Sequence, residues 1–363
     1  MRFLLSGYYG FANLGDEAIL EQMVRRLKTQ YPMADIDVLS EHPAVTAHDY
    51  GVASTPRADL GAARRAIERC DVFLSGGGGL LQNATSFRSL LYYAGLLRTA
   101  IRAGKKAMIF AQSIGPLDFL GRQTVRECCR GLTAATVRDE RSRTLLASLL
   151  PGVPLERTAD PVFLYDPPDE PVDLTPFGLE TGTAPLVVVA VRKTSHFEAV
   201  TALLAAAVDR LADRGAHVAF VPFGGLADAE AATAVIRKCK SRPALVELPN
   251  LDTVAAAVAR AHLVIGVRLH ALILAIRFGV PFVAVAYDPK VSGLCEDVGY
   301  PLEPLWSAHG ESRAAASPEG VDAAWDRHDE LAALLAGATT AQRSLAEANF
   351  SALARVVAAS GKK

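Results

Sequence analysis

Arg268, His270 and Lys290 interrupt a segment that is otherwise apolar almost throughout, LVIGVRLHALILAIRFGVPFVAVAYDPK at residues 263–290. Because an unpaired charge is costly to bury, we expect LVIGV to be a buried strand that ends just before Arg268. His270 would lie in the first turn of the next helix, where its charge could change when an anionic ligand arrives. Lys290 follows the next strand, so neighbouring parallel strands would gather the three groups into an anion site.

Two further arginines follow predicted strands, at the position where ligands of parallel α/β sheets bind. Arg138 lies in TVRDERS, directly before Asp139, and Arg192 follows the apolar run VVVAV. An isolated Arg-Asp pair is usually a solvated ion pair. However, Arg138, Arg192 and Arg268 would share one topological location, which favours a site that handles anions.

The loop after the first predicted strand, GYYGFANLGDEA, has glycines that would let a ligand approach the backbone. The helix that follows would point free N–H groups toward the loop. We therefore name Asn13, Gly15, Asp16 and Glu17 as candidate substrate-binding residues. Alternatively, the glycines only turn the chain, and the two acids only stabilise the helix N-terminus.

Two more loops of the first half follow predicted strands. SGGGGLLQ, residues 75–82, places four consecutive glycines at the ligand edge, and glycines are entropically costly in a folded chain. This favours a ligand or an interdomain contact at Gly77 and Gly78. In QSIGP, Gln112 could hydrogen-bond a sugar or a phosphate, and Asp139 is a further candidate for substrate binding.

Composition excludes several classes of function. The formal net charge is −1 and no long run of lysine or arginine occurs, so nucleic acid is not an expected partner. The five cysteines have no CxxC spacing, and there is no HExxH, GxSxG, Walker A or EF-hand pattern. Alternation within a strand explains the DID at residues 35–37 better than metal binding does. No apolar run reaches about 18 residues, so we expect a cytoplasmic protein, and peripheral contact with a membrane stays open.

Apolar runs alternate with amphipathic stretches along the chain, in an order that predicts parallel sheets covered by helices on both faces. Five prolines between residues 165 and 185 indicate a connection between domains. We expect an α/β fold of two Rossmann-like, doubly wound domains that face each other across a cleft. They would span residues 1–170 and 171–338, and residues 339–363 would form a helix that packs back on the first domain.

The end of the chain predicts two helices. Ser317 would be the N-cap of the first helix, with Pro318 at its first helical position and Gly337 at its end. A second amphipathic stretch covers roughly residues 340–358.

Together these motifs resemble the polysaccharide pyruvyl transferases, and most closely the CsaB type, which modifies bacterial cell-wall glycans. GYYGFANLGDEAIL, LSGGGGLLQ, QSIGPL, VRDERS, ADPVF, AVR and the segment from GVRLH to YDPK occur in the family's order over about residues 1–300. The resemblance implies a glycosyltransferase-B-like fold and transfer of an enolpyruvyl group from phosphoenolpyruvate to a sugar, which leaves a 4,6-linked pyruvate ketal.

For the CsaB type, the implied acceptor is a β-linked N-acetylmannosamine on a lipid-linked precursor of a secondary cell-wall polymer. The product is what S-layer-homology domains bind, and the acceptor would be met at the inner face of the membrane. The acceptor would bind the N-terminal domain and phosphoenolpyruvate the C-terminal domain. No cofactor is required, and the sequence does not specify the oligomeric state.

The resemblance also implies roles for particular residues. Arg268 and His270 would contact phosphoenolpyruvate, Lys290 would assist, and Arg138 matches a further functional arginine. PFGG at residues 222–225 lacks the polar side chains that relatives have in this segment.

The residues suit the implied chemistry. Arginines and a lysine can hold both the phosphate and the carboxylate of phosphoenolpyruvate by charge-assisted hydrogen bonds, and Arg192 is a candidate for this. We assign His270 as the general acid that protonates the methylene carbon. Asp16, Glu17 and Asp139 are the candidate bases for the sugar hydroxyls.

Three other functions compete with this interpretation. A nucleotide-sugar glycosyltransferase would use the same architecture and basic cleft. A non-catalytic glycan- or anion-binding protein would bind the same ligands without releasing phosphate. A nicotinamide-dependent oxidoreductase is weaker, because Glu41 follows the second strand as a ribose-binding acid would, but the first loop has the wrong glycine spacing.

Overall fold

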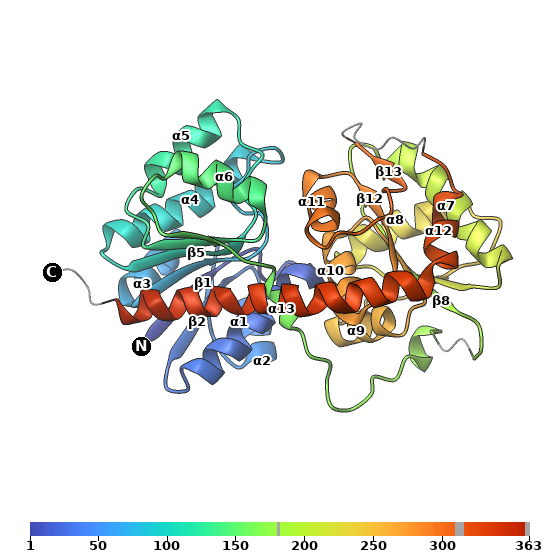
Figure 1. Cartoon of the computed structure of the whole chain (residues 1–363). Coiled ribbons are helices and arrows are strands. Elements are labelled where there is room, and N and C mark those ends of the chain that lie inside the picture. The colour runs from blue at the N-terminus through green and yellow to red at the C-terminus, as the bar shows by residue number, and fades with distance from the viewer. Residues whose placement is uncertain (180–181, 309–315, 360–363) are drawn as a thin grey trace. The chain divides into compact units, whose positions relative to one another are not determined.

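The structure is a computed structural model of the chain, and it describes residues 1–179, 182–308 and 316–359. The chain divides into two compact units. Unit 1 comprises residues 1–164 together with the chain from Gln342 onward, and unit 2 comprises Tyr165–Ala341. Each unit contains one parallel sheet with helices on both faces, as the alternation in the sequence predicts (Figure 1).

The sheet of unit 1 has seven strands, all parallel to their neighbours. In spatial order these are β3 (Ala53–Pro56), β2 (Asp35–Ser40), β1 (Arg2–Ser6), β4 (Val72–Gly76), β5 (Lys106–Gln112), β6 (Ala134–Val137) and β7 (Leu155–Arg157). The strand order reverses between β1 and β4. In doubly wound sheets, ligands bind outside the carboxyl ends of the strands at such a switch point.

The helices of unit 1 lie on the two faces of this sheet. They are α1 (Leu14–Gln30), α2 (Pro43–Tyr50), α3 (Leu60–Arg69), α4 (Phe87–Arg102), α5 (Phe119–Cys128), α6 (Glu140–Leu149) and a short 3-10 helix at Pro161–Leu164. Figure 1 shows α4, α5 and α6 above the sheet and α1 and α2 below it. The apolar faces of α3, α4, α5 and α6 share one core with the strands.

The sheet of unit 2 has six parallel strands. In spatial order these are β10 (Ala244–Leu245), β9 (His217–Phe220), β8 (Leu186–Ala190), β11 (Leu263–Gly266), β12 (Phe282–Ala286) and β13 (Trp306–Ser307). The order reverses between β8 and β11. Its helices are α7 (Phe197–Asp213), α8 (Gly225–Ile236), α9 (Leu251–Ala259), α10 (Leu269–Phe278), α11 (Pro289–Asp297) and α12 (Gly320–Asp326), with a 3-10 turn at Thr175–Phe177.

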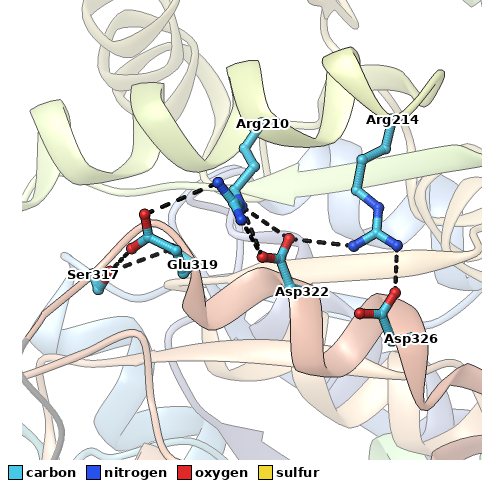
Figure 2. Close-up of polar contacts among 6 residues, drawn as sticks. All are labelled: Arg210, Arg214, Ser317, Glu319, Asp322 and Asp326. Atoms are coloured by element: carbon cyan, nitrogen blue, oxygen red, sulfur yellow. Dashed lines mark hydrogen bonds and ion pairs between the residues drawn. The ribbon is translucent and has the colours of Figure 1, made fainter.

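Ion pairs fasten α12 to α7 within unit 2, as Figure 2 shows. Arg210 donates to both carboxylate oxygens of Asp322, from Nε at 2.9 and 2.8 Å, and also lies 3.9 Å from Glu319. Arg214 pairs with Asp322 at 3.3 Å and with Asp326. The guanidinium groups on this face of α7 are therefore matched by acids on α12.

The last two helices, α12 and α13 (His328–Ala358), correct two predictions. Gly337 does not end a helix, because it lies within α13, which is 31 residues long. A mid-helix glycine costs only about 1 kcal/mol, and burial of Leu331 and Leu335 offsets that cost. Ser317 is not an N-cap either: α12 begins at Gly320, with Glu319 at the cap position in helical conformation.

The second part of α13 belongs to unit 1 and is bonded to it by buried polar groups. Asn349 accepts a hydrogen bond from the hydroxyl of Thr158 (2.7 Å) and donates to the carbonyl of Ala159 (2.9 Å). The ring of Phe350 contacts that of Phe110 edge-on, with 5.1 Å between centroids. Among the described helices, none is both long and apolar enough to cross a membrane.

Candidate functional site

The loop between β1 and α1 is fastened by Glu17. Its carboxylate accepts hydrogen bonds from the backbone amide of Gly10 (2.8 Å) and from the hydroxyl of Tyr50 (2.8 Å). Burial raises the pKa of the Glu17 carboxyl, although both hydrogen bonds act in the opposite direction. Glu17 therefore has a structural task in this loop, whatever it contributes to binding.

Asn13, Gly15 and Asp16 lie where α1 begins, against the glycine-rich loop that follows β4. The Asn13 amide donates to Oδ2 of Asp16. Gly77 and Gly78 have φ angles of 57° and 66°, and a β-carbon at Gly78 would lie only 2.7 Å from Oδ1 of Asp16. The missing side chains thus let the two loops pack together, and they bring Asp16 and Gly78 side by side at the switch point.

Gln112 and Asp139 join neighbouring strand ends. Gln112 is fully buried, and its Nε2 donates to the carbonyl oxygen (2.7 Å) and hydroxyl (2.8 Å) of Ser75 at the end of β4. Asp139 accepts a hydrogen bond from Ser113 Oγ (2.7 Å) and caps α6 by accepting the Ser142 amide (2.7 Å). In this structure Nε2 of Gln112 and the carboxylate of Asp139 are used within unit 1, and the buried Oε1 of Gln112 has no hydrogen-bond partner among the described residues.

Arg138 forms a buried ion pair with Asp160, which lies in the segment after β7. The exposed fractions of the two side chains are 8% and 2%. Arg138 Nε also donates to Ser113 Oγ (2.8 Å). Removing one partner of a charge pair buried this deeply strongly destabilises the folded protein, because the other charge stays buried and unpaired. Arg138 therefore links β5, β6 and the chain beyond β7. This structural role is additional to the functional role predicted from the sequence.

In unit 2, Arg268 follows β11 and its guanidinium is clamped by Asp228 in the first turn of α8. Arg268 Nε and Nη2 donate to Oδ2 and Oδ1 of Asp228 at 2.7 and 2.6 Å. Gly224 makes room for this pair, because a β-carbon there would lie 2.1 Å from Nη2. Asp228 is buried, whereas 15% of the Arg268 side chain is exposed. The Nη1 group donates to no other described residue, so it is available to a ligand.

Arg192, which follows β8, reaches in the opposite direction. Its Nη1 donates to the hydroxyl of Tyr287 (2.9 Å), which follows β12. Since β11 lies between β8 and β12, the Arg192 side chain spans the end of β11. Arg268 reaches instead past β8 to α8, the helix that follows β9. The two guanidinium groups therefore diverge along the carboxyl edge of the sheet.

His270 and Lys290 begin the helices that follow two neighbouring strands. β11 and β12 pair in parallel, with Gly266 opposite Ala284. His270 is the second residue of α10, and Lys290 is the second residue of α11, where its backbone amide donates to the capping carboxylate of Asp288 (2.9 Å). The neighbouring strands assumed for Arg268 and Lys290 are therefore present.

A cavity of about 550 Å³ opens between α7 and α8 at the same edge of unit 2. Its polar lining includes Lys193, Thr194, Ser195, Glu198 and Lys238. None of the four predicted cationic residues of unit 2 lines it. Among the described residues, no three His, Cys, Asp or Glu side chains are grouped as metal ligands.

Three residues in contact with the predicted arginines were missed from the sequence. Asp160 stands in the motif ADPVF, and an acid between apolar residues indicates a buried partner for a cation. Asp228 comes three residues after PFGG, in the first turn of the next helix. Tyr287 follows β12 directly. Each lies far in sequence from its arginine, so only the strand order places it.

Comparison with solved structures gives the fold. HepE from Anabaena in complex with UDP-glucose matches with a TM-score of 0.65 and 12% identity, covering 99% of this chain and 100% of that one. The UDP-GlcNAc 2-epimerase from Neisseria meningitidis bound to UDP-GlcNAc gives 0.64 and 10%, with 98% and 100% covered. A glycosyltransferase from Rickettsia africae gives 0.64 and 10%, with 99% of each covered. At such low identity these likenesses show the fold alone, and the predicted glycosyltransferase-B-like α/β class is confirmed.

Sequence comparisons give a more specific result. No curated protein matches the chain. The family model described as polysaccharide pyruvyl transferase matches residues 13–289, which include every predicted site residue except Lys290.

Proposed function

Because the chain belongs to the polysaccharide pyruvyl transferase family, we propose that it transfers the enolpyruvyl group of phosphoenolpyruvate to a sugar. The product is a 4,6-linked pyruvate ketal, and inorganic phosphate is released. The acceptor we propose is that of the CsaB type, a β-linked N-acetylmannosamine on a lipid-linked secondary cell-wall polymer precursor. The pyruvylated polymer would then be a ligand for S-layer-homology domains.

The observation that carries the donor assignment is the clamped guanidinium of Arg268. Asp228 holds Nε and Nη2 of Arg268, so the Nη1 group points in one direction. The side chain therefore loses little conformational entropy when a ligand binds to Nη1. Phosphoenolpyruvate carries a phosphate and a carboxylate, which arginines bind by charge-assisted hydrogen bonds. Arg192 lies at the same sheet edge, and Lys290 follows the strand next to that of Arg268. Arg268 and Lys290 are suited to one small dianionic donor, and Arg192, although its guanidinium points away from Arg268, adds positive charge at the same edge.

The reaction needs one proton donor and a route for two hydroxyl protons. His270 donates a proton to the methylene carbon of phosphoenolpyruvate, which becomes the methyl group of the ketal. One sugar hydroxyl attacks the cationic carbon, phosphate leaves with the former enol oxygen, and the second hydroxyl attacks the same carbon. The two hydroxyl protons pass to a base and to phosphate, so atoms and charge balance.

For the base we propose Asp16. The carboxylates of Glu17 and Asp139 each accept two hydrogen bonds that hold loops or cap a helix. Asp16 accepts a hydrogen bond from the Asn13 amide, and its Oδ1 faces Gly78 at the switch point of unit 1, where the glycine has no side chain to cover it. Unit 1 would therefore bind the sugar acceptor. We place this reaction on the cytoplasmic side of the membrane.

Thermal unfolding of the full chain with candidate donors tests this function. Phosphoenolpyruvate should raise the unfolding temperature of the protein, and UDP- or GDP-sugars should not, because a ligand stabilises only the state that binds it. Protection by a nucleotide sugar without protection by phosphoenolpyruvate would remove the proposal in favour of a glycosyltransferase. A non-catalytic binding protein would show protection but no acceptor-dependent release of phosphate.

A further inference from the structure

Four large apolar side chains are exposed together in unit 1. Phe87 and Leu91 lie in the first turns of α4, and Phe119 and Leu120 begin α5. Their exposed fractions are 39%, 48%, 72% and 61%. Single exposed apolar residues are ordinary, but a group of them marks an interaction surface. We call these four residues the apolar rim.

Hydrogen bonds between the two preceding loops make the rim one surface. The backbone amide of Asn83, before α4, donates to the carbonyl of Pro116 (3.2 Å), and its side-chain oxygen accepts the amide of Asp118 (3.1 Å). The first turns of α4 and α5 are therefore neighbours. Both helices begin after the carboxyl ends of β4 and β5, the sheet edge at which Asp16 and Gly78 lie.

The part of the chain that carries the rim is strongly cationic. Residues 57–130 contain twelve Lys and Arg but five Asp and Glu, although the whole chain has a net charge of −1. No acid occurs between Asp71 and Asp118. Asp118 itself caps α5 by accepting the amide of Gly121 (2.7 Å). The rim therefore lies in a region of excess positive charge, which the overall composition conceals.

The exposed arginines beyond the rim are not neutralised. Arg88 and Arg98 of α4 and Arg122 and Arg126 of α5 are exposed, and none of them forms an ion pair with another described residue. The arginines of α7 differ, because acids of α12 pair with them (Figure 2). The four arginines of α4 and α5 therefore keep their positive charge, in contrast to those of α7.

Spacing along the helices separates the apolar groups from two of the four arginines. Arg98 comes seven residues after Leu91, and Arg126 comes six residues after Leu120, which at 1.5 Å per residue places them roughly 10 Å further along. Apolar groups at a membrane interface enter about 5–10 Å, to the boundary between headgroups and acyl chains. Arginines set back by about this depth would meet the phosphates of the headgroups.

We propose that the apolar rim and these four arginines form a docking surface for an anionic lipid bilayer. Charge complementarity and apolar depth together favour a bilayer over a nucleic acid, which would use the arginines but not the rim. This proposal rests on the proposed function in one respect: docking on a bilayer would bring the enzyme to a lipid-linked acceptor. Vesicle binding itself requires no substrate and no turnover.

Sedimentation of the full chain with phosphatidylglycerol vesicles and with neutral phosphatidylcholine vesicles tests this. The unchanged protein should sediment with the anionic vesicles, and salt should weaken that binding. Phe119→Ser/Leu120→Ser and Arg98→Gln/Arg126→Gln should each lower the partition coefficient about tenfold or more. Met33→Ser, which alters an exposed apolar side chain elsewhere in unit 1, and Arg237→Gln/Arg242→Gln, which removes the same charge from unit 2, should bind like the unchanged chain.

Two results would overturn the docking surface. One is that the unchanged protein does not bind anionic vesicles at low salt. The other is binding that the apolar-rim variant retains in full, which would show that the rim does not enter the bilayer. Phosphate release with a water-soluble acceptor is measured in parallel and should be the same in the rim variant as in the unchanged chain. Its absence in both proteins would count against the proposed function and not against docking.

Discussion

Arg268 and Asp228 form a two-point clamp, with guanidinium–carboxylate distances of 2.7 and 2.6 Å, in space that Gly224 leaves empty. The clamp joins the end of β11 to the first turn of α8. It fixes the direction of the one guanidinium that the family resemblance assigns to the donor.

Gly224→Ala should weaken donor binding without unfolding the protein. The new β-carbon would lie 2.1 Å from Arg268 Nη2, so the guanidinium must move. We expect the Kd for phosphoenolpyruvate, measured by calorimetry, to rise about tenfold, which is a loss of about 1.4 kcal/mol. Gly293→Ala in α11 is the matched control, since its β-carbon would meet nothing within 4 Å. Unchanged affinity in Gly224→Ala would mean that the clamp does not position the donor.

Asp228→Asn should show whether Asp228 acts on donor binding or on the chemical step. Asparagine keeps the shape of the side chain but accepts at only one atom and carries no charge, so Arg268 loses half of its clamp. We expect a raised KM for phosphoenolpyruvate with a smaller change in kcat, because Asp228 acts through Arg268. A loss confined to kcat would instead place Asp228 in the chemical step.

Removing either partner of the buried Arg138–Asp160 pair should destabilise unit 1. Arg138→Met and Asp160→Leu each leave one unpaired buried charge, at a cost of about 3–5 kcal/mol. The double variant should be more stable than the sum of the two single effects predicts. Urea unfolding of all four proteins measures this coupling. Additive effects would show that the pair is not coupled in solution, and would leave Arg138 free for the functional role that the sequence suggests.

His262 should make unit 2 less stable in acid. Its ring stacks on that of His328, with 4.0 Å between centroids, and contacts Trp325 edge-on at 4.6 Å. Burial lowers the pKa of His262, the neighbouring His328 lowers it further, and Asp329 opposes the shift. The unfolded chain therefore binds this proton more tightly, and stability falls as the pH drops below about 6.5.

His262→Phe keeps an aromatic ring at this position and removes the titrating group. The free energy of unfolding of the unchanged protein should fall more steeply between about pH 6.5 and pH 5 than that of the variant. Parallel profiles would mean that His262 does not contribute to the acid sensitivity.

His270→Gln should retain donor binding and lose turnover. A general acid contributes about 10²–10⁴-fold to a rate, so we expect kcat to fall by at least about a hundredfold while the Kd for phosphoenolpyruvate stays within a few-fold. His48→Gln on α2, an exposed histidine, is the control and should behave like the unchanged chain. Near-normal turnover in His270→Gln would exclude the acid role.

Much of the architecture is predictable because it follows from local apolar patterns. Runs such as RFLLS and KAMIFAQ are β1 and β5, and the strand, helix and strand from LVIGV to FVAVAY are β11, α10 and β12. Short edge strands are not predictable in this way. β3, β7 and β13 have two to four residues and little apolar content, and they form because a neighbouring strand offers unpaired backbone groups.

The site was predictable only in part, for a related reason. The sequence places Arg192, Arg268 and Lys290 after strands, and the structure has them there. The sequence does not give the direction in which a long side chain points, because that depends on partners from other elements. Asp228 turns Arg268 toward α8, and Tyr287 turns Arg192 toward β12. Such pairs depend on strand order, which a periodic pattern does not encode.

The most direct test is release of inorganic phosphate from phosphoenolpyruvate by the full chain, with and without a synthetic β-N-acetylmannosaminide acceptor. We expect release that requires the acceptor, together with a gain of one pyruvyl group by the sugar in mass spectrometry. In heavy water, the methyl group of the ketal should carry one deuterium, delivered through His270. Binding of phosphoenolpyruvate without release of phosphate, with every acceptor hexosamine tried, would contradict the account.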